Sequence, residues 1–212
     1  MLPPPHDLPD AATLAVGAYR AHRLGHTGRG VRVGLADTGV GGQQYFAAHG
    51  YRWTGDAGQA AAHGTGMAAV LFAVAPDITV VSARVDNDPV AALQRLENEA
   101  VDLVLCSWGV PLGGPVDEAC RPFAGRLFAA SNGRPFSPAS LPIVHKIAPA
   151  DGWPSGPYRI HTYTTWRGTS VAAALACGVA AILVGAGHSP LQAAQQVAIE
   201  GPKALSNLTL SI

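Results

Sequence analysis

The run "VAAALACGVAAILVG", residues 171–185, constrains the fold of this 212-residue chain more than any other segment. Its fifteen residues are too few to cross a bilayer, which needs roughly 20 apolar residues in a helix. A helix that is apolar on every side has to be buried inside a globular protein. The sequence therefore predicts a tightly packed core helix, opened by the small polar triplet Gly168-Thr169-Ser170.

The composition is that of a globular protein with few charges. Apolar residues make up 48% of the chain and charged residues only 13%. The 14 basic and 14 acidic side chains balance to a formal net charge of zero, which gives no electrostatic case for binding nucleic acid or an anionic membrane surface. A chain of this length is expected to form one domain. We expect an extended Pro-rich arm over residues 1–10 and a single compact domain over residues 11–212.

The cysteine pattern argues against a zinc protein, and the N-terminus argues against a secretory signal. Cys106, Cys120 and Cys177 are odd in number and show neither a CxxC pair nor a Cys/His spacing typical of zinc. We expect them to be small buried hydrophobic residues, and we expect no metal and no cofactor. The start "MLPPPHDLPD" lacks the basic region and apolar stretch of a secretory signal. For a complete gene product this predicts a cytoplasmic protein.

Apolar strands alternate with helices along the chain. Strands are expected at residues 31–36, 78–85, 101–109 and 125–133, and helices, besides the apolar one, at residues 11–24, 63–75, 88–100, 115–121 and 189–199. A loop up to about residue 60 and an irregular segment over 133–166 complete the pattern. Strands without strict alternation, separated by helices, indicate a parallel sheet covered on both faces. The sequence therefore predicts a three-layer α/β domain with a central, mostly parallel sheet.

Three polar residues stand at the ends of these elements. Asp37 follows the first strand, His63 opens the second helix, and Ser170 opens the apolar helix. Functional groups in such folds gather at the carboxyl ends of strands and at helix N-termini, and Asp, His and Ser are the components of a nucleophilic triad. Taken singly, each residue has a simpler interpretation, as a turn residue, a helix-start residue and an N-cap respectively.

Two other motifs suggest different functions, but the sequence around each of them does not fit that function. The "DTG" of residues 37–39 occurs in aspartic proteases, but these need two such motifs or a dimer of β-barrels, and this chain has one motif and many helices. "GRGVRVG", residues 28–34, carries the glycines of a dinucleotide-binding loop. These glycines precede the predicted strand, whereas in dinucleotide-binding folds they follow it.

Taken together, five segments resemble the subtilisin-like serine proteases, whose triad follows the chain order Asp, His, Ser. They are "GVRVGLADTGV", "HGTGMAAVLFAVAPDITVVSARV", "VDLVLCSWG", "FAASNG" and "RGTSVAAALACGVAAIL". In that family they match the aspartate strand, the histidine helix, a strand that leads into a substrate segment, the oxyanion-hole asparagine and the nucleophile helix. The resemblance covers roughly residues 20–200, except for 134–165. It implies a subtilisin-like fold and a serine endopeptidase.

The resemblance also implies roles for particular residues. Asp37, His63 and Ser170 correspond to the triad, and Asn132 with the backbone N–H of Ser170 corresponds to the oxyanion hole. The substrate-binding residues would be Ser107, Trp108, Gly109, Val110, Ala130 and Ser131. Val110 stands where the family usually has glycine, which predicts a narrowed primary specificity pocket.

The chain departs from the family in being compact. Almost no loop separates the predicted histidine helix from the next strand, where many members bind calcium, so we expect no dependence on calcium. Only "DNDP", residues 86–89, stands where relatives form a second edge of the substrate cleft. The N-terminal residues do not resemble an inhibitory pro-segment. We therefore expect either a restricted substrate channel or a partner chain that supplies the missing edge.

These features favour a dedicated processing protease, which would cut a peptide or protein substrate such as the leader of a ribosomally made natural product. Two other interpretations stay open. One is a transpeptidase or macrocyclase that uses the same acyl-enzyme, and the other is a catalytically silent binding subunit. Ala174 supports the first, since the family usually has proline there, in what we expect to be the first turn of the helix. Without the proline ring, Ser170 would be less crowded and an incoming amine would have more room.

Overall fold

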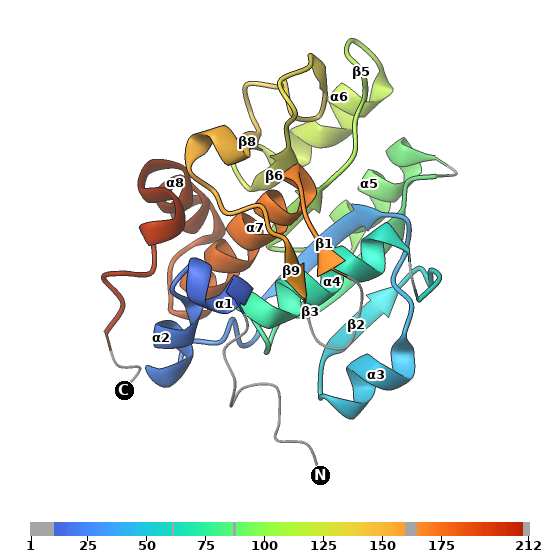
Figure 1. Cartoon of the computed structure of the whole chain (residues 1–212). Coiled ribbons are helices and arrows are strands. Elements are labelled where there is room, and N and C mark those ends of the chain that lie inside the picture. The colour runs from blue at the N-terminus through green and yellow to red at the C-terminus, as the bar shows by residue number, and fades with distance from the viewer. Residues whose placement is uncertain (1–10, 61, 87, 160–164, 210–212) are drawn as a thin grey trace.

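The computed structural model describes residues 11–60, 62–86, 88–159 and 165–209, and the extended arm expected over residues 1–10 lies outside them. Its centre is a six-stranded sheet with the order β2-β3-β1-β4-β6-β8, in which every pair runs parallel (Figure 1). The strands are β1 (Arg32–Asp37), β2 (Arg52–Gly55), β3 (Thr79–Arg84), β4 (Leu103–Cys106), β6 (Leu127–Ala130) and β8 (His145–Ile147). The predicted mostly parallel sheet is confirmed.

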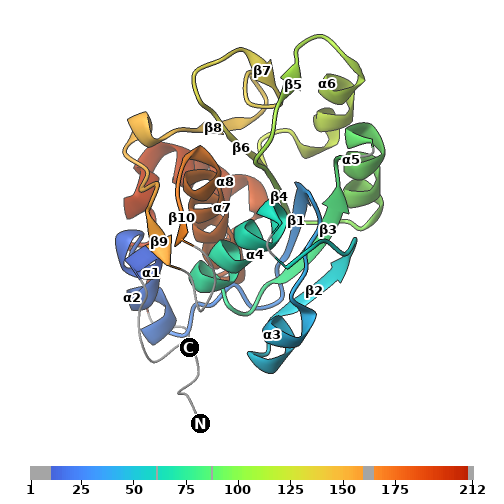
Figure 2. The same ribbon diagram turned by 45° about the vertical axis from the view of Figure 1, so that its right-hand side comes forward.

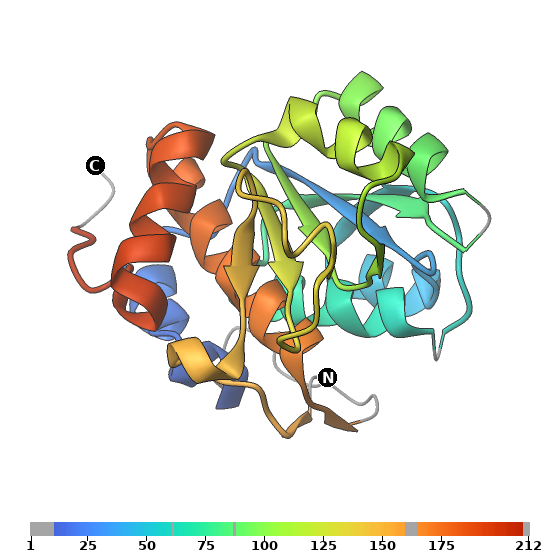
Figure 3. The same cartoon turned by 90° about the horizontal axis from the view of Figure 1, so that it is seen from above.

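Helices cover both faces of this sheet (Figure 2 and Figure 3). On one face lie α4 (His63–Val74) and α7 (Thr169–Gly185), with α8 (Pro190–Glu200) packed against α7. On the other face lie α5 (Pro89–Asn98) and α6 (Pro115–Cys120). The short helices α1 (Ala11–Ala15) and α2 (Ala18–Arg23) pack against α4 and α7 respectively. The three-layer α/β architecture is therefore confirmed.

The strands read as continuous apolar runs because both of their faces are buried. In β1, Val33 and Leu35 join the apolar cluster that includes α4 and α7. Ala36, which points to the opposite face, joins the cluster that includes α5 and α6. A strand placed between two helical layers has no solvent side, so no polar alternation appears in its sequence.

The apolar helix α7 is the core helix that its sequence predicts. Every residue from Val171 to Leu183 is buried. Its small residues bring it close to α4, since a Cβ atom built on Gly178 would lie 2.9 Å from the Cβ of Val74. Within the part of the chain that the structure describes, no helix has the length and apolar character needed to span a membrane.

The structure differs from the sequence-based prediction in three segments. The helix expected over residues 11–24 is two helices, because Gly17 adopts a left-handed φ of 70° between them. The loop expected before residue 60 contains α3 (Gln43–Ala48) and the edge strand β2. The segment 133–166, expected to be irregular, contributes β8 to the sheet. Elements of three to six residues are too short to show a periodicity of their own.

Within the described ranges, two small antiparallel pairs and three 3₁₀ turns complete the fold. β5 (Val110–Pro111) pairs with β7 (Phe136–Ser137), and β9 (Tyr158–Arg159) pairs with β10 (Thr165–Trp166). The 3₁₀ turns are η1 (Arg121–Phe123), η2 (Pro149–Asp151) and η3 (Gly201–Lys203).

The three cysteines are free and buried, as expected. Burial raises the pKa of the Cys120 thiol to about 12. Burial also raises the pKa values of Cys106 and Cys177 well above that of an ordinary thiol. Because a thiolate is the reactive form of cysteine, these residues serve packing and not chemistry.

Candidate active site

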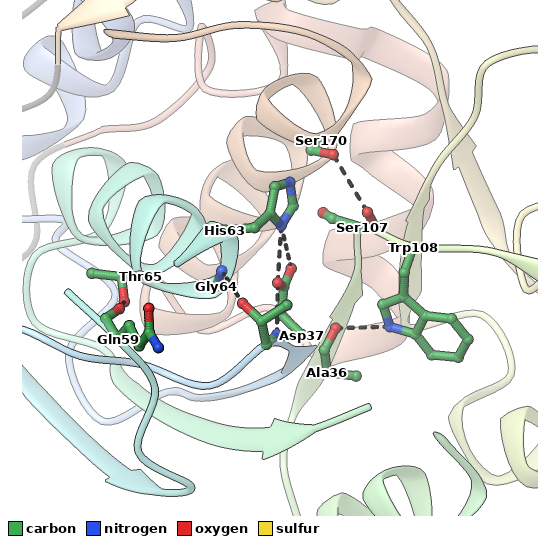
Figure 4. Close-up of polar contacts among 10 residues, drawn as sticks. Ala36, Asp37, Gln59, His63, Gly64, Thr65, Ser107, Trp108 and Ser170 are labelled. Atoms are coloured by element: carbon green, nitrogen blue, oxygen red, sulfur yellow. Dashed lines mark hydrogen bonds and ion pairs between the residues drawn. The ribbon is translucent and has the colours of Figure 1, made fainter. Parts of the chain in front are cut away.

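Asp37 and His63 meet at the carboxyl end of β1. The imidazole Nδ1 of His63 lies 2.9 Å from each carboxylate oxygen of Asp37, which is 3% exposed (Figure 4). The hydrogen bond with Asp37 raises the pKa of His63 above its ordinary value of 6.5, burial partly offsets this rise, and the charge of Asp37 adds a smaller increase. Since Nδ1 donates to the carboxylate, the neutral ring keeps Nε2 as an acceptor on its opposite side.

The His-Gly-Thr sequence is what allows this close approach. A Cβ atom on Gly64 would lie 2.5 Å from the carbonyl oxygen of Gly39 and 3.2 Å from the Cβ of Asp37, so only glycine fits there. The hydroxyl of Thr38 accepts a hydrogen bond from the Gly64 N–H at 3.0 Å. The hydroxyl of Thr65 accepts one from the Gly41 N–H at 2.8 Å. The first turn of α4 is thereby tied to the end of β1.

Ser170 lies in the first turn of α7. Gly168 precedes the helix with φ 115° and ψ −174°, a backbone conformation that side chains strongly disfavour. This glycine turns the chain from β10 into α7 and leaves Ser170 partly accessible at the N-terminus of a 17-residue helix. The partial positive charge at a helix N-terminus favours negative charge nearby.

The structure places Ser170 on the side of the His63 ring opposite Asp37 (Figure 4). The two side chains come from α4 and α7, which pack against each other. The Ser170 hydroxyl donates to the carbonyl oxygen of Ser107, at a long distance of 3.4 Å. No hydrogen bond links Ser170 with His63 among the described residues, so the Ser170 side chain would have to rotate from Ser107 toward the ring to make one. Such looser contacts are common in sites without substrate.

A small cavity of about 130 Å³ lies beside Ser170. Five of the six predicted substrate-binding residues and the predicted oxyanion asparagine line it: Ser107, Trp108, Gly109, Ala130, Ser131 and Asn132. Thr169, the neighbour of Ser170, lines it too. The structure thus brings together residues that follow β4, the end of β6 with the loop after it, and the start of α7, which lie far apart in the sequence.

Val110 does not line this cavity, contrary to its predicted role in narrowing the pocket. It lies in β5 and pairs with Ser137. This pairing returns the chain to the cavity, so that Phe136 packs against Gly109, where an added Cβ atom would lie 3.0 Å from the Cβ of Phe136. Phe136, Ala139 and Arg134 line the cavity as well.

Asn132 lies at the rim of the cavity and is exposed. Its carboxamide oxygen accepts a hydrogen bond from the Arg134 N–H at 3.2 Å. Because the oxygen is engaged in this way, the NH₂ group of the carboxamide remains available as a donor. Asn132 and Thr169, which begins α7, border the same small space.

Two tryptophans lie at the site: Trp108, one of the predicted substrate-binding residues, and Trp166, to which sequence reasoning assigns no role. The ring of Trp166 lies edge-on to His63 with centroids 5.9 Å apart, and it packs directly over Gly66. Trp108 is anchored by a hydrogen bond from its indole N–H to the carbonyl oxygen of Ala36 at 2.8 Å. Together these rings border the Asp37–His63 pair on two sides.

Ala174 occupies a different place in its helix from the one expected. Because α7 begins at Thr169, Ala174 is its sixth residue and lies in the second turn, fully buried. Its N–H is therefore in position to bond to the carbonyl of Ser170. A proline there would remove a helical hydrogen bond, so the first-turn argument for the ligase hypothesis does not hold.

Within the described residues, no group of three or more His, Cys, Asp or Glu side chains gathers in a way that could hold a metal ion. Two larger hollows, of about 640 and 580 Å³, lie between α2 and η3 and beside α8, away from the residues above.

The chain has an α/β fold of the subtilisin-like type. No protein-family description matches the sequence, and no curated protein matches it. Among solved structures, the chain is similar to a cold-adapted subtilisin-like serine proteinase, with a TM-score of 0.64, 18% identity and 82% of each chain covered. It is also similar to a lanthipeptide protease, with a TM-score of 0.69, 18% identity, 93% of this chain covered and 87% of the other. At this identity the likeness is one of fold.

Proposed function

We propose that this protein is a serine endopeptidase that uses Asp37, His63 and Ser170 as its triad. The observation that carries the proposal is the placement of His63 between the buried carboxylate of Asp37 and the hydroxyl of Ser170. Burying the carboxylate of Asp37 costs free energy, and its pairing with an imidazole whose other nitrogen faces a serine is what the triad chemistry needs.

The reaction follows from the geometry. Ser170 Oγ attacks the carbonyl carbon of the scissile peptide bond while His63 Nε2 takes its proton. The carbonyl oxygen becomes negative and is bound by the Asn132 carboxamide and the Ser170 backbone N–H. His63 then gives the proton to the departing amine, which leaves an ester between the acyl group and Ser170. Water attacks this ester while His63 takes its proton; the acid is released, and His63 returns the proton to Ser170 Oγ.

We also propose that the enzyme processes a particular peptide precursor and does not degrade proteins generally. The cavity beside Ser170 is small, and only residues 85–88 connect β3 with α5, where a second edge of the cleft would be needed. One edge, Ser107-Trp108-Gly109, holds a peptide less firmly than two, so a partner chain or the precursor itself would supply the other. The likeness to a lanthipeptide protease supports this proposal.

Labelling with a fluorophosphonate probe tests the proposed chemistry. We expect stoichiometric labelling of Ser170 in the wild-type chain and none in Ser170→Ala, with equal melting temperatures for both. Ser140→Ala, which removes an exposed hydroxyl, is the matched control and should label normally. Absence of labelling in the folded wild-type protein would favour the silent binding subunit.

A digestion experiment tests the processing role. The protein is incubated with casein and with the small peptides encoded beside its own gene, and the products are analysed by mass spectrometry. We expect one cut in one of these peptides and little digestion of casein. Extensive cleavage of casein at many positions would contradict the processing role while leaving the protease proposal intact.

A further inference from the structure

The cavity beside Ser170 is built to receive one side chain. Its volume of about 130 Å³ is well below the roughly 300–1,000 Å³ of pockets that bind small molecules. It borders both Thr169, next to the nucleophile, and Asn132, the proposed oxyanion donor. A substrate carbonyl held between these groups would direct the side chain of its own residue into this cavity. What the cavity accepts therefore decides where the chain is cut, if the proposed function holds.

Arg134 is the one charged residue that lines the cavity, within the part of the chain that the structure describes. The described ion pairs of the molecule involve other cations, and none includes Arg134. By contrast, the guanidinium groups of Arg20 and Arg126 donate to backbone carbonyls. Among the described contacts, Arg134 is engaged only through its backbone: its N–H donates to Asn132 and its carbonyl oxygen accepts from the Phe136 N–H.

The other residues that line the cavity include hydrogen-bond donors but no carboxylate that could pair with Arg134. Ser107, Ser131 and Thr169 contribute hydroxyl groups, and the aromatic rings of Trp108 and Phe136 limit the width. A guanidinium forms its strongest hydrogen bonds with carboxylates, whereas a lysine or arginine of a substrate would be repelled.

We propose that this cavity takes an acidic side chain, glutamate or aspartate, of the substrate residue whose carbonyl Ser170 attacks, and that Arg134 selects it. The inference rests on the proposed function and adds the substrate class: peptides cut on the carboxyl side of an acidic residue. Arg134 is a binding residue in this proposal, since it contacts the substrate side chain and not the reacting atoms.

Peptidyl diphenyl phosphonates test this selection, because Ser170 Oγ displaces phenoxide from phosphorus and no natural substrate is needed. A matched series differs only in the side chain next to phosphorus: Glu, Asp, Gln, Leu and Lys. A hydrogen bond to a charged group is worth about 1.5–3 kcal/mol, so we expect the Glu probe to inactivate the wild-type chain at least about tenfold faster than the Gln probe. The ratio should shrink at high salt, because Arg134 is exposed.

Variants of Arg134 test whether its guanidinium group causes the preference for the Glu probe over the Gln probe. Arg134→Gln should bring the Glu-to-Gln ratio close to one, Arg134→Glu should reverse the preference toward the Lys probe, and Arg134→Lys should restore part of the original ratio. Arg167→Gln is the matched control: Arg167 is exposed and lies near Ser170 in the sequence, yet it does not line the cavity, so the ratio should stay as in the wild type.

The simple fluorophosphonate, which carries no side chain, separates the two proposals. If it labels Ser170 but the Glu and Gln probes react equally fast with the wild type, the selection by Arg134 is wrong and the protease function stands. If it does not label the folded protein, the protease function fails and this inference fails with it. A preference for Glu that survives in Arg134→Gln would assign the selection to another group.

Discussion

Both carboxylate oxygens of Asp37 lie 2.9 Å from Nδ1 of His63, so the imidazolium form of this ring is stabilised in the folded chain. The hydrogen bond with Asp37 is the main reason that the pKa of His63 is raised above 6.5. Only the neutral ring accepts the proton of Ser170. We therefore expect kcat/KM to rise with pH through an apparent pKa above 6.5, measured as a pH–rate profile.

Asp37→Asn tests whether the charge of Asp37 raises the pKa of His63. Loss of the charge should move the acid limb of the profile to lower pH, and loss of the correct tautomer should lower kcat by about 10⁴-fold. The contribution of the Asp37–His63 pair to the stability of the folded chain falls as pH rises, whereas kcat/KM rises. The stabilisation from charged His63 is present below pH 6.5 and is lost as pH rises through the raised pKa. An acid limb unmoved by Asp37→Asn would contradict the assigned pairing.

Asn132→Ala should lower kcat by about 10²–10³-fold and change KM little, because the carboxamide is needed only when negative charge develops. Its position at the rim of the cavity beside α7 is the structural basis for this expectation. Steady-state kinetics check the result. Asn98→Ala, at an exposed position of α5, is the control and should be as active as the wild type. Equal activity of Asn132→Ala would show that another donor binds the oxyanion.

Gly66→Ala should lower activity without unfolding the chain. A Cβ atom at this position would lie 2.3 Å from the ring of Trp166, so the ring has to move away from His63. Displacements of about 1 Å near reacting groups cost up to about 10²-fold in rate. The double variant Gly66→Ala with Trp166→Leu relieves the clash, and its loss should be smaller than the sum of the single losses. Additive losses would mean that the contact does not position His63.

Activity and melting temperature should be independent of calcium. Calcium prefers six or more oxygen ligands, and the connection between β3 and α5 offers few side chains that could provide them. Differential scanning fluorimetry with and without a chelator checks this, with added magnesium as the control. A melting temperature that falls by several degrees in chelator, and recovers only with calcium, would contradict the expectation.

Ala174→Pro should destabilise the protein by about 3 kcal/mol, because proline in the second turn removes a hydrogen bond and crowds the preceding turn. Ala174→Gly keeps the N–H and should cost only about 1 kcal/mol. Urea unfolding measures both. With an activated peptide ester and an amine nucleophile, we expect the same ratio of ligated to hydrolysed product in Ala174→Pro as in the wild type. A higher share of ligation in the wild type would instead support a transpeptidase.

The sequence predicts those parts of this protein whose structure is determined locally. The helix that contains Ser170 is a long apolar run, and the strand that ends at Asp37 is a short, mostly apolar one that lies between two glycine-containing turns; their structure follows from these features. The edge strand β2 and the three-residue strand β8 are too short for such a signal and form only because the sheet beside them offers free hydrogen-bonding groups. Arg134 and Trp166 lie in or beside irregular segments, where the position of a side chain depends on distant contacts.

The place of α7 in the chain order has a consequence for biosynthesis. This helix covers Leu103, Leu105 and Phe128 on one face of the sheet, yet it is translated after every strand of that sheet. A nascent chain that ends before residue 169 would hold Asp37 and His63 but expose this apolar face. We therefore expect this face of the sheet to stay uncovered until residues 169–185 have left the ribosome, so that Ser170 joins Asp37 and His63 only at that stage. Chains truncated before α7 should aggregate and should become substrates of chaperones.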